Sequence, residues 1–377
     1  MNKKVYRIGV DARPLSTSLS GVGRMIAEIL INFPNKEKYE FYLFSQKAVH
    51  ADHKKITDLP NIKWIMGKGI LSSKGATFFN IYLPLIIPKF KLDLFWGSQQ
   101  VIPPFLGKIP VVLTFYDFVA YFFPGTMRKL AIYQQKLFQN ISIKKADYIL
   151  SISRQTQNDL IKLFDYPVKQ ADVAYPGIEP AELKYCLQQK PTKRILELPK
   201  KYFLSVSTIE PRKNYPFLLQ AYQEYRNIAK KNKIPWIIAG KIGWEDQEFL
   251  EKLKSETARG DIIILQSPTD VELHHLYRNA TVFLFASHYE GFGIPLLEAL
   301  AHNKKSIVSD IPTFHEIGKN QIVYLKTDSA EKWAIVMLQQ QSVKKLPMID
   351  LKQFGWKASA AKTENIFAHV LHKSKTT

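Results

Sequence analysis

The feature that most constrains the fold is a regular alternation of short, continuously apolar runs with longer amphipathic stretches. In the first half the apolar runs cover residues 5–11, 39–45, 91–98, 109–117 and 148–153. The rhythm restarts later, with apolar runs at residues 201–208, 235–241, 261–266, 281–287 and 305–310. Such runs are typical of parallel strands covered by helices on both faces. The pattern therefore predicts an α/β fold of two doubly wound, Rossmann-like domains.

The length and composition agree with two domains. A chain of 377 residues with 46% hydrophobic residues can form two sizeable cores. A polar, proline-flanked segment at 191–198 has the composition of a linker. We therefore expect an N-terminal domain at 1–188 and a C-terminal domain at 189–355, followed by a terminal helix that begins near residue 356.

Several classes of protein are disfavoured by composition. The single cysteine, Cys186, allows no disulfide framework and is typical of a reducing compartment. The nine histidines form no ligand cluster, and we expect His274 and His275 on a helix surface, so no metal site is predicted. No apolar run approaches the roughly 20 residues that span a bilayer, and the first residues do not resemble a secretory signal. We expect a cytoplasmic protein, either soluble or peripheral to the inner face of the plasma membrane.

The formal net charge of +20 is spread over both halves of the chain. A basic surface favours partners that carry phosphate, namely nucleotides, anionic lipids or nucleic acids. A lysine-rich surface that serves only solubility is an equally good interpretation at this point. Charge alone also leaves open a nucleic-acid-binding protein, although no motif that reads DNA or RNA accompanies it.

The stretch SHYEGFGIPLLEALAH at 287–302 places two glutamates around a glycine turn that enters a helix. Backbone N–H groups at a helix start favour an anion such as a diphosphate. Glu290 at the loop entrance could bind sugar hydroxyls, and Glu298 one turn into the helix suits the paired hydroxyls of a ribose. Alternatively, both glutamates simply stabilise the helix N-terminus. The residues of the turn expected to approach the ligand are Gly291, Phe292, Gly293 and Ile294.

Three further segments follow predicted strands. Arg212 and Lys213 form a cation pair suited to phosphate oxygens, unless they are two solvated charges in a loop. Gly21 and Gly23 lie in a predicted loop that enters a helix, but they lack the third glycine of the dinucleotide fingerprint.

Tyr116 and Asp117 end another strand. There Asp117 is either a polar contact for a ligand or a turn residue that caps a helix.

Taken together, these segments resemble the retaining glycosyltransferases of family four, which have the GT-B fold. Within that family they resemble the bacterial mannosyl- and rhamnosyltransferase-like group of polysaccharide assembly. The Glu-x7-Glu pattern from Glu290 to Glu298 is the most specific element of the resemblance. The matching segments run in order along nearly the whole chain: DARPL, SGVGR, FWGSQQVIPP, YDF, ILSISRQTQNDL, VAYPGI, STIEPRKN, IIAGKIGW, SHYEGFGIPLLEALA and FGWKASA.

The resemblance implies that the C-terminal domain binds a nucleotide-diphosphate sugar, with GDP-mannose the expected type. Arg212 and Lys213 would neutralise the diphosphate, Glu290 would hold the donor sugar and Glu298 the ribose. The loop around Ser267 would lie near the base. Enzymes of this kind generally need no metal, because cationic side chains and a helix dipole stabilise the leaving diphosphate.

It also implies that the N-terminal domain binds a glycan or polyprenyl-diphosphate-linked acceptor. Gly21 and Gly23 would close over the donor phosphates, and the last helix, residues 356–377, would cross back onto this domain. The resemblance implies catalytic roles for Glu290, Asp117 and the residue at position 116. The sequence departs from the family there, because Tyr116 replaces a common histidine that is associated with the donor sugar and the reaction centre. Ser207 likewise stands where the family usually has a glycine.

A catalytically weak binder of sugar nucleotides and a sugar-nucleotide epimerase of the same fold therefore stay as alternatives. Nucleic acid is not an expected partner.

Two stretches of the N-terminal domain, at 72–91 and 122–138, mix apolar and aromatic residues with lysines. They could rest on anionic lipid. Alternatively, they are domain core flanked by solvated lysines.

Overall fold

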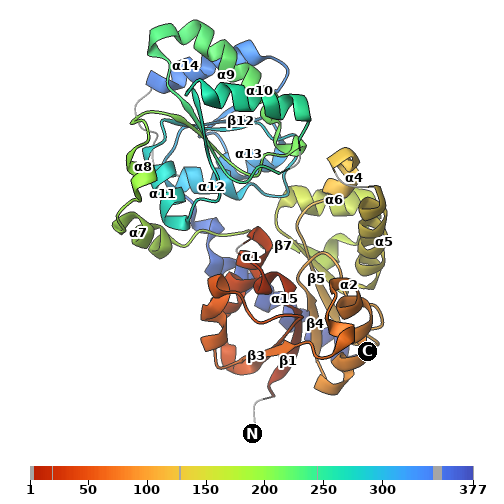
Figure 1. Cartoon of the computed structure of the whole chain (residues 1–377). Coiled ribbons are helices and arrows are strands. Elements are labelled where there is room, and N and C mark those ends of the chain that lie inside the picture. The colour runs from red at the N-terminus through yellow and green to blue at the C-terminus, as the bar shows by residue number, and fades with distance from the viewer. Residues whose placement is uncertain (1–3, 19, 127–128, 244, 343–349, 377) are drawn as a thin grey trace. The chain divides into compact units, whose positions relative to one another are not determined.

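The computed structural model describes residues 4–18, 20–126, 129–243, 245–342 and 350–376. Contacts divide the chain into two compact units: residues 1–177 with 352–377, and residues 178–351 (Figure 1). Each unit contains one parallel sheet with helices around it, as the alternating pattern predicted. Among the described residues, no helix combines the length and the hydropathy that a bilayer crossing requires.

The first unit contains a seven-stranded sheet in the order β3-β2-β1-β4-β5-β6-β7, with every neighbouring pair parallel. Its strands are β1 (Tyr6–Asp11), β2 (Tyr39–Ser45), β3 (Ile62–Met66), β4 (Leu94–Gly97), β5 (Val111–Phe115), β6 (Tyr148–Ser151) and β7 (Ala171–Val173). Its α-helices are α1 (Gly21–Ile31), α2 (Gly75–Thr77), α3 (Leu83–Ile86), α4 (Val119–Phe122), α5 (Lys129–Lys145), α6 (Arg154–Phe164) and α15 (Trp356–Thr376). Strands β4 and β5 are buried along their whole length, which explains why they read as continuous apolar runs.

The second unit contains a six-stranded parallel sheet in the order β10-β9-β8-β11-β12-β13. Its strands are β8 (Phe203–Val206), β9 (Trp236–Ala239), β10 (Ile262–Leu265), β11 (Val282–Phe285), β12 (Ser306–Ser309) and β13 (Val323–Leu325). Its α-helices are α7 (Pro180–Gln188), α8 (Lys193–Leu196), α9 (Tyr215–Ala229), α10 (Gln247–Ala258), α11 (Asp270–Asn279), α12 (Ile294–Ala301), α13 (Pro312–Gly318) and α14 (Ala330–Ser342). Its core is rich in aromatic residues, including the fully buried Trp236 and Trp333.

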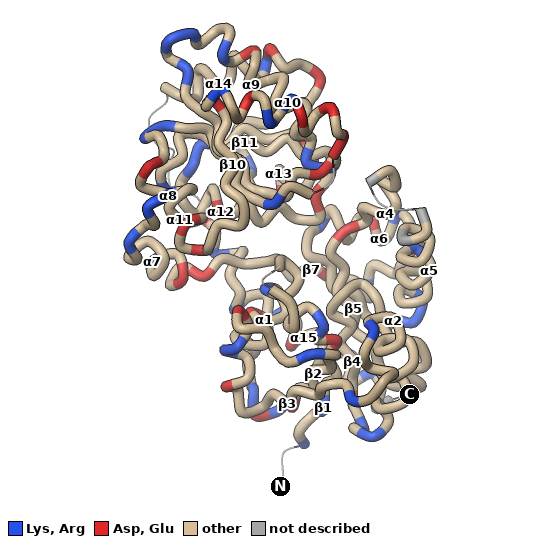
Figure 2. The backbone as a smooth tube through the Cα atoms, in the orientation of Figure 1, with Lys and Arg blue, Asp and Glu red and all other residues tan. Residues whose placement is uncertain are grey.

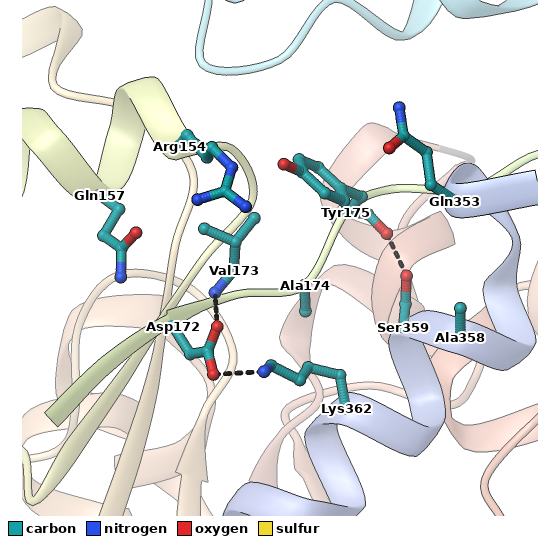
Figure 3. Close-up of a pocket in the computed structure, with 10 residues that line it drawn as sticks. All are labelled: Arg154, Gln157, Asp172, Val173, Ala174, Tyr175, Gln353, Ala358, Ser359 and Lys362. Atoms are coloured by element: carbon teal, nitrogen blue, oxygen red, sulfur yellow. Dashed lines mark hydrogen bonds and ion pairs between the residues drawn. The ribbon is translucent and has the colours of Figure 1, made fainter. Parts of the chain in front are cut away.

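The last helix, α15, belongs to the first unit. Figure 3 shows its contacts with β7 and with the segment that follows this strand: Lys362 pairs with Asp172 of β7, and the Ser359 hydroxyl donates to the Tyr175 carbonyl. Helix α15 also contacts the connection between α1 and β2, where Asn35 donates to Glu364 at 2.8 Å. Helix α7 is grouped with the second unit, where it packs against α11.

The two sheets share one topology. Numbered within each unit, the first six strands of each sheet follow the order 3-2-1-4-5-6. In such a sheet the strand order reverses between strands 1 and 4, and ligands bind at the carboxyl ends of those two strands. The reversal falls between β1 and β4 in the first unit and between β8 and β11 in the second. We call these the first and second switch points.

Candidate functional site

At the second switch point, the loops after β8 and β11 are joined to each other. Arg212 and Lys213 lie in a short 3-10 turn, Pro211–Lys213, which ends at Asn214 in the left-handed conformation with φ of 56°. The His288 backbone N–H donates to the Arg212 carbonyl at 2.9 Å, which holds the loop after β11 against this turn. The strand order thus brings residues 212–213 and 288–290 together, although they are far apart in the sequence.

Glu290 lies at the centre of this arrangement and is 6% exposed. Its Oε2 accepts from Arg212 at 2.7 Å, and its Oε1 accepts from the Lys213 ammonium at 2.5 Å. The Ser287 hydroxyl donates to Oε1 at 2.7 Å, and Thr313 donates to the Glu290 carbonyl at 2.8 Å. Both predicted phosphate-binding cations and the predicted sugar-binding carboxylate therefore form one buried cluster.

The electrostatics of the cluster are dominated by burial and by its two cations. Burial raises the pKa of Glu290, but Arg212 and Lys213 outweigh it and lower that pKa to about 2. Burial also lowers the pKa of the Lys213 ammonium, although Glu290 opposes this change. Arg212 additionally pairs with Glu210 at 2.8 Å, so these four side chains carry two positive and two negative charges. The cations are already compensated, and a diphosphate would have to share them with the two carboxylates.

Glu298 lies in α12, which begins directly after this cluster. Gly293 caps the helix with φ of 111°, a conformation that favours glycine, and a Cβ there would lie 3.0 Å from Phe314. Pro295 occupies the first turn of the helix, where its missing N–H costs nothing. The backbone conformation and the close contact with Phe314 explain why a glycine stands at position 293. The turn brings the start of α12 next to Glu290.

A neighbouring helix fixes the Glu298 carboxylate. The Tyr277 hydroxyl, from α11, donates to Glu298 Oε2 at 2.9 Å. Burial and the nearby Glu298 raise the pKa of Tyr277 well above its usual value, so its proton stays on the hydroxyl. The Tyr277 ring stacks on His302 at 5.7 Å, and His302 is 2.9 Å from His274 between ring nitrogens. This network leaves Glu298 9% exposed with one oxygen held by an uncharged donor.

The prediction that His274 and His275 lie on a helix surface is wrong. Each is 7% exposed, because this face of α11 is covered. His274 contacts His302, and His275 contacts the Gln189 carbonyl at the end of α7 at 3.0 Å. Over the described residues, no group of three His, Cys, Asp or Glu side chains is arranged to hold a metal ion.

Two other predicted positions have distinct local roles. Ser267 follows β10, an edge strand two places from β8, and has a left-handed conformation with φ of 48°. The Ser207 hydroxyl is 2.9 Å from the Tyr215 hydroxyl, so the residue that replaces a family glycine ties the loop after β8 to α9. A Cβ at Gly240 would lie 2.1 Å from the Ser207 carbonyl, which shows how closely the loops after β8 and β9 approach.

The first switch point contains a cavity of about 580 Å³. Behind it, the fully buried carboxylate of Asp11 accepts from Arg13 at 2.9 and 2.8 Å and from Gln99 at 2.7 Å. The Arg13 guanidinium also lies over the Phe79 ring at 3.9 Å. The residues that line the cavity are Arg13, Pro14, Ser16, Thr17, Ser20, Val22, Gln46, Lys47, Gln99, Gln100 and Tyr116.

Gly21 and Gly23 were expected in a loop, but they form the first turn of α1. The Ser20 hydroxyl caps the helix by accepting from the Gly23 N–H at 3.1 Å, and this cap extends the helix to Gly21. A Cβ at Gly23 would lie 3.0 Å from His53 and 3.2 Å from the Pro14 carbonyl. Close packing therefore requires a glycine at 23, while its neighbours Ser20 and Val22 line the cavity.

Tyr116 lines the same cavity, but its hydroxyl is already bonded. It donates to the Ser98 carbonyl at 2.9 Å, and burial with the nearby Asp11 raises its pKa far above the usual range. Asp117 accepts from the Val119 N–H at 3.1 Å at the start of α4, which is the capping role considered as its alternative.

Sequence reasoning missed several residues that hold these sites in place. Glu210 stands two positions before Arg212, and that spacing could have suggested an ion pair. Ser287 and Tyr277 gave no signal, because their partners Glu290 and Glu298 are brought to them by the fold. Asp11 and Arg13 lie in the DARPL segment and Gln99 lies in FWGSQQVIPP, but the bond from Gln99 to Asp11 joins the ends of two strands that are far apart in the sequence.

Two family models match the chain. The model described as Glycosyltransferase Family 4 matches residues 19–182, and the model described as Glycosyl transferases group 1 matches residues 188–339. O-antigen chain mannosyltransferase B of Escherichia coli is 29% identical over 292 residues, 74% of each chain. O-antigen chain mannosyltransferase RfbU of Salmonella typhimurium is 24% identical over 249 residues, which are 63% of this chain and 64% of the relative.

Solved structures share the fold at low sequence identity. WaaG, a glycosyltransferase involved in lipopolysaccharide biosynthesis, has a TM-score of 0.64 at 14% identity and covers 98% of this chain and 99% of its own. HepE of Anabaena, in complex with UDP and glucose, has a TM-score of 0.62 at 15% identity over 99% of both chains. With these neighbours, the two sheets and the two matched models, the chain belongs to the family 4 glycosyltransferases with the GT-B fold, as its motifs predicted.

Proposed function

We propose that this glycosyltransferase moves a hexosyl group, with retention, from a nucleotide-diphosphate sugar to a glycan or lipid-linked glycan in the synthesis of a cell-surface polysaccharide. The observation that carries the proposal is the buried Arg212–Lys213–Glu290 cluster at the second switch point. The mannosyltransferase relatives support mannose as the sugar and therefore GDP-mannose as the donor type. The O-antigen names of the same relatives support a polysaccharide product.

Diphosphate binding follows from the donors that the cluster presents. A lysine ammonium has three N–H donors and an arginine has five, so each can serve Glu290 and a phosphate oxygen together. The N–H groups at the start of α12 and the helix dipole add a favourable field for negative charge. We expect Arg212 and Lys213 to turn partly from Glu290 toward the diphosphate, which gives the leaving group its charge stabilisation without requiring a metal.

The two carboxylates then select hydroxyls at either end of the donor. Glu290 is ionised near neutral pH, since its pKa is about 2, and an ionised carboxylate only accepts hydrogen bonds. Glu290 would accept from the sugar, and Glu298, oriented by Tyr277, would accept from the ribose.

In the transfer step, the bond between the anomeric carbon and the diphosphate oxygen breaks. The acceptor oxygen bonds to the anomeric carbon on the same face, and its proton passes to the leaving diphosphate.

The first experiment identifies the nucleotide. A thermal-shift panel of GDP, UDP, dTDP and ADP should show that one of the four nucleotides stabilises the protein. A ligand at 100 times its Kd adds about 2.7 kcal/mol to the free energy of unfolding. The matched control is Glu298→Gln, which keeps the shape of the side chain but weakens its acceptor strength toward the ribose. The assignment of the second switch point fails if no nucleoside diphosphate stabilises the protein.

The second experiment tests transfer itself. Purified protein with GDP-mannose and a lipid-linked glycan acceptor should release GDP, and proton NMR of the product should show the same anomeric configuration as the donor. A product of inverted configuration contradicts the retaining step. Nucleotide binding without any turnover, over a range of donors and acceptors, indicates the non-catalytic binder instead.

A further inference from the structure

Helix α5 of the first unit exposes an apolar stripe. Leu130, Tyr133, Leu137 and Ile141 are between 46% and 68% exposed. With 3.6 residues per turn, these four side chains fall within an arc of about 80° and extend along roughly 16 Å of the helix. The stripe is therefore one continuous surface and not a set of scattered residues.

The opposite face of α5 fixes this orientation. Ile132 and Ile143 are buried, and the buried Ser142 hydroxyl accepts from the Ile102 N–H at 3.0 Å. Gln139 is 1% exposed and donates to Gln100 at 2.9 Å. One face of the helix already packs on the sheet, so the exposed stripe does not contribute to the packing of the core.

A neighbouring loop extends the stripe with a large aromatic side chain. Phe105 is 88% exposed and has a left-handed conformation with φ of 61°, which is uncommon for an aromatic residue. The loop is tied to α5 at both ends, by the Ile102–Ser142 bond and by Lys145, which donates to the Gly107 carbonyl at 3.0 Å. Phe105 is thus exposed on a loop that is held against the C-terminal end of α5.

The surroundings of the stripe are basic. Lys136, Lys144 and Lys145 lie on α5, and the helix contains no acidic residue (Figure 2). Between Asp93 and Asp147, Asp117 is the only acidic residue in the sequence. An apolar face flanked by lysines is complementary to a surface that is apolar inside and anionic outside.

We propose that the α5 stripe, with Phe105, docks on an anionic membrane surface. A second copy of the chain is a poorer occupant, because a two-fold interface would bring together two copies of a helix that contains lysines and no acidic residue. The proposal concerns the first unit alone and does not depend on the donor sugar. The stretch at 72–91 was the other candidate for contact with lipid. Its Phe78, Phe79 and Leu83 are buried core residues, and only a minority of its large apolar side chains, such as Leu85, are exposed.

The test is flotation of the full-length protein with vesicles of 70% phosphatidylcholine and 30% phosphatidylglycerol at low salt. We expect binding to these vesicles, little binding to pure phosphatidylcholine, and at least tenfold weaker binding for the double variant Tyr133→Gln/Leu137→Gln. Lys144→Glu should weaken binding only to the anionic vesicles. The matched controls are Leu196→Gln and Ile335→Gln, which change exposed apolar residues of the second unit and should bind like the wild type.

Three outcomes would overturn the proposal: no binding by the wild type, undiminished binding by the double variant, or a concentration-dependent dimer that the double variant abolishes. Phe105→Ser, at a position with almost no packing, provides a second variant if the double variant is poorly folded. Calorimetry with GDP keeps the two proposals separate. Its result should be the same for wild type and stripe variants, so loss of vesicle binding says nothing against nucleotide binding.

Discussion

The two switch points share one strand order, but their buried charges are arranged differently. At the second, a carboxylate that is 6% exposed lies between two cations that are themselves largely buried. At the first, the fully buried Asp11 has one cation, Arg13, whose side chain is 24% exposed. The second switch point concentrates ammonium and guanidinium donors that are paired with two carboxylates, whereas the first offers a cavity of about 580 Å³ lined mainly by amide and hydroxyl groups.

The difference suggests how a shared topology can serve two substrates. Amide and hydroxyl groups both donate and accept, so they suit the neutral hydroxyls of a glycan. Concentrated guanidinium and ammonium donors suit the charged part of a nucleotide sugar. The comparison therefore makes the first switch point the candidate for the acceptor and the second the candidate for the donor.

The largest effect should come from Glu290→Ala. Its removal leaves the buried Arg212 and Lys213 without their main partner, a change that typically costs about 3–5 kcal/mol. We expect transfer to be abolished and the second unit to unfold at markedly lower denaturant concentration, measured by activity and by circular dichroism. Unchanged turnover would contradict the assignment of Glu290, and an unchanged denaturation midpoint would contradict its role in the cluster.

The pH dependence of stability gives an independent check. Because the pKa of Glu290 is lowered to about 2, its contribution is complete above the unfolded value of about 4.5 and is lost as the pH falls toward 2. The shift corresponds to about 3 kcal/mol at most. The variant Glu290→Gln should lack this component, so the difference in unfolding free energy between wild type and variant should shrink between pH 5 and pH 2.5.

The sequence predicted the parts of this comparison that are local. Strands such as β8 and β11 are buried on both faces, and so they read as apolar runs that fix the fold class. Arg212, Lys213 and Glu290 were recognisable because each lies in the segment between such a strand and the next helix. The position of Glu298 one turn into a helix was likewise evident from Pro295 and the glycines before it.

The remaining features depend on contacts between distant segments. Tyr277 of α11 reaches Glu298 of α12 only in the folded unit. His274 is buried beside His302, which follows α12, and His275 is buried against the end of α7. The pairing of Asp11 with Gln99 requires β1 and β4 to be neighbours. Helix α5 has apolar residues on both faces, so no periodicity shows which face is exposed.

The next effect, on ligand affinity, separates the two switch points. Lys213→Ala removes a charge-assisted hydrogen bond to the diphosphate, worth about 1.5–3 kcal/mol, or roughly a 10- to 150-fold rise in Kd. Gln99→Ala at the first switch point, and Lys332→Ala on the exposed side of α14, should leave the Kd unchanged in calorimetry with the stabilising nucleoside diphosphate. Equal losses for Lys213→Ala and Gln99→Ala would assign the nucleotide to both units and remove the proposed division.

A smaller effect is expected from Asp11→Asn, the counterpart of the Glu290 change in the first unit. The substitution removes the charge that Arg13 compensates, but Arg13 is partly exposed and also lies over Phe79, so solvent and the ring can accommodate it. We expect a loss of about 1–3 kcal/mol in unfolding free energy, measured by denaturant titration, with nucleoside diphosphate affinity unchanged. A loss as large as that of Glu290→Ala would show that the two buried carboxylates are equally dependent on their cations.

The smallest effects come from two matched tyrosines, each of which donates one hydrogen bond. Tyr277→Phe removes the donor that orients Glu298, at a cost of about 1 kcal/mol. It should weaken binding of GDP about fivefold and reduce the preference for GDP over its 2′-deoxy analogue, because Glu298 no longer meets the ribose in a fixed orientation. Tyr116→Phe removes a hydrogen bond to the Ser98 carbonyl that contributes a similar free energy. It should lower the stability of the protein slightly and leave the affinity for GDP and the turnover intact. A large fall in turnover for Tyr116→Phe would mean that this hydroxyl leaves Ser98 during the reaction and acts on the substrate.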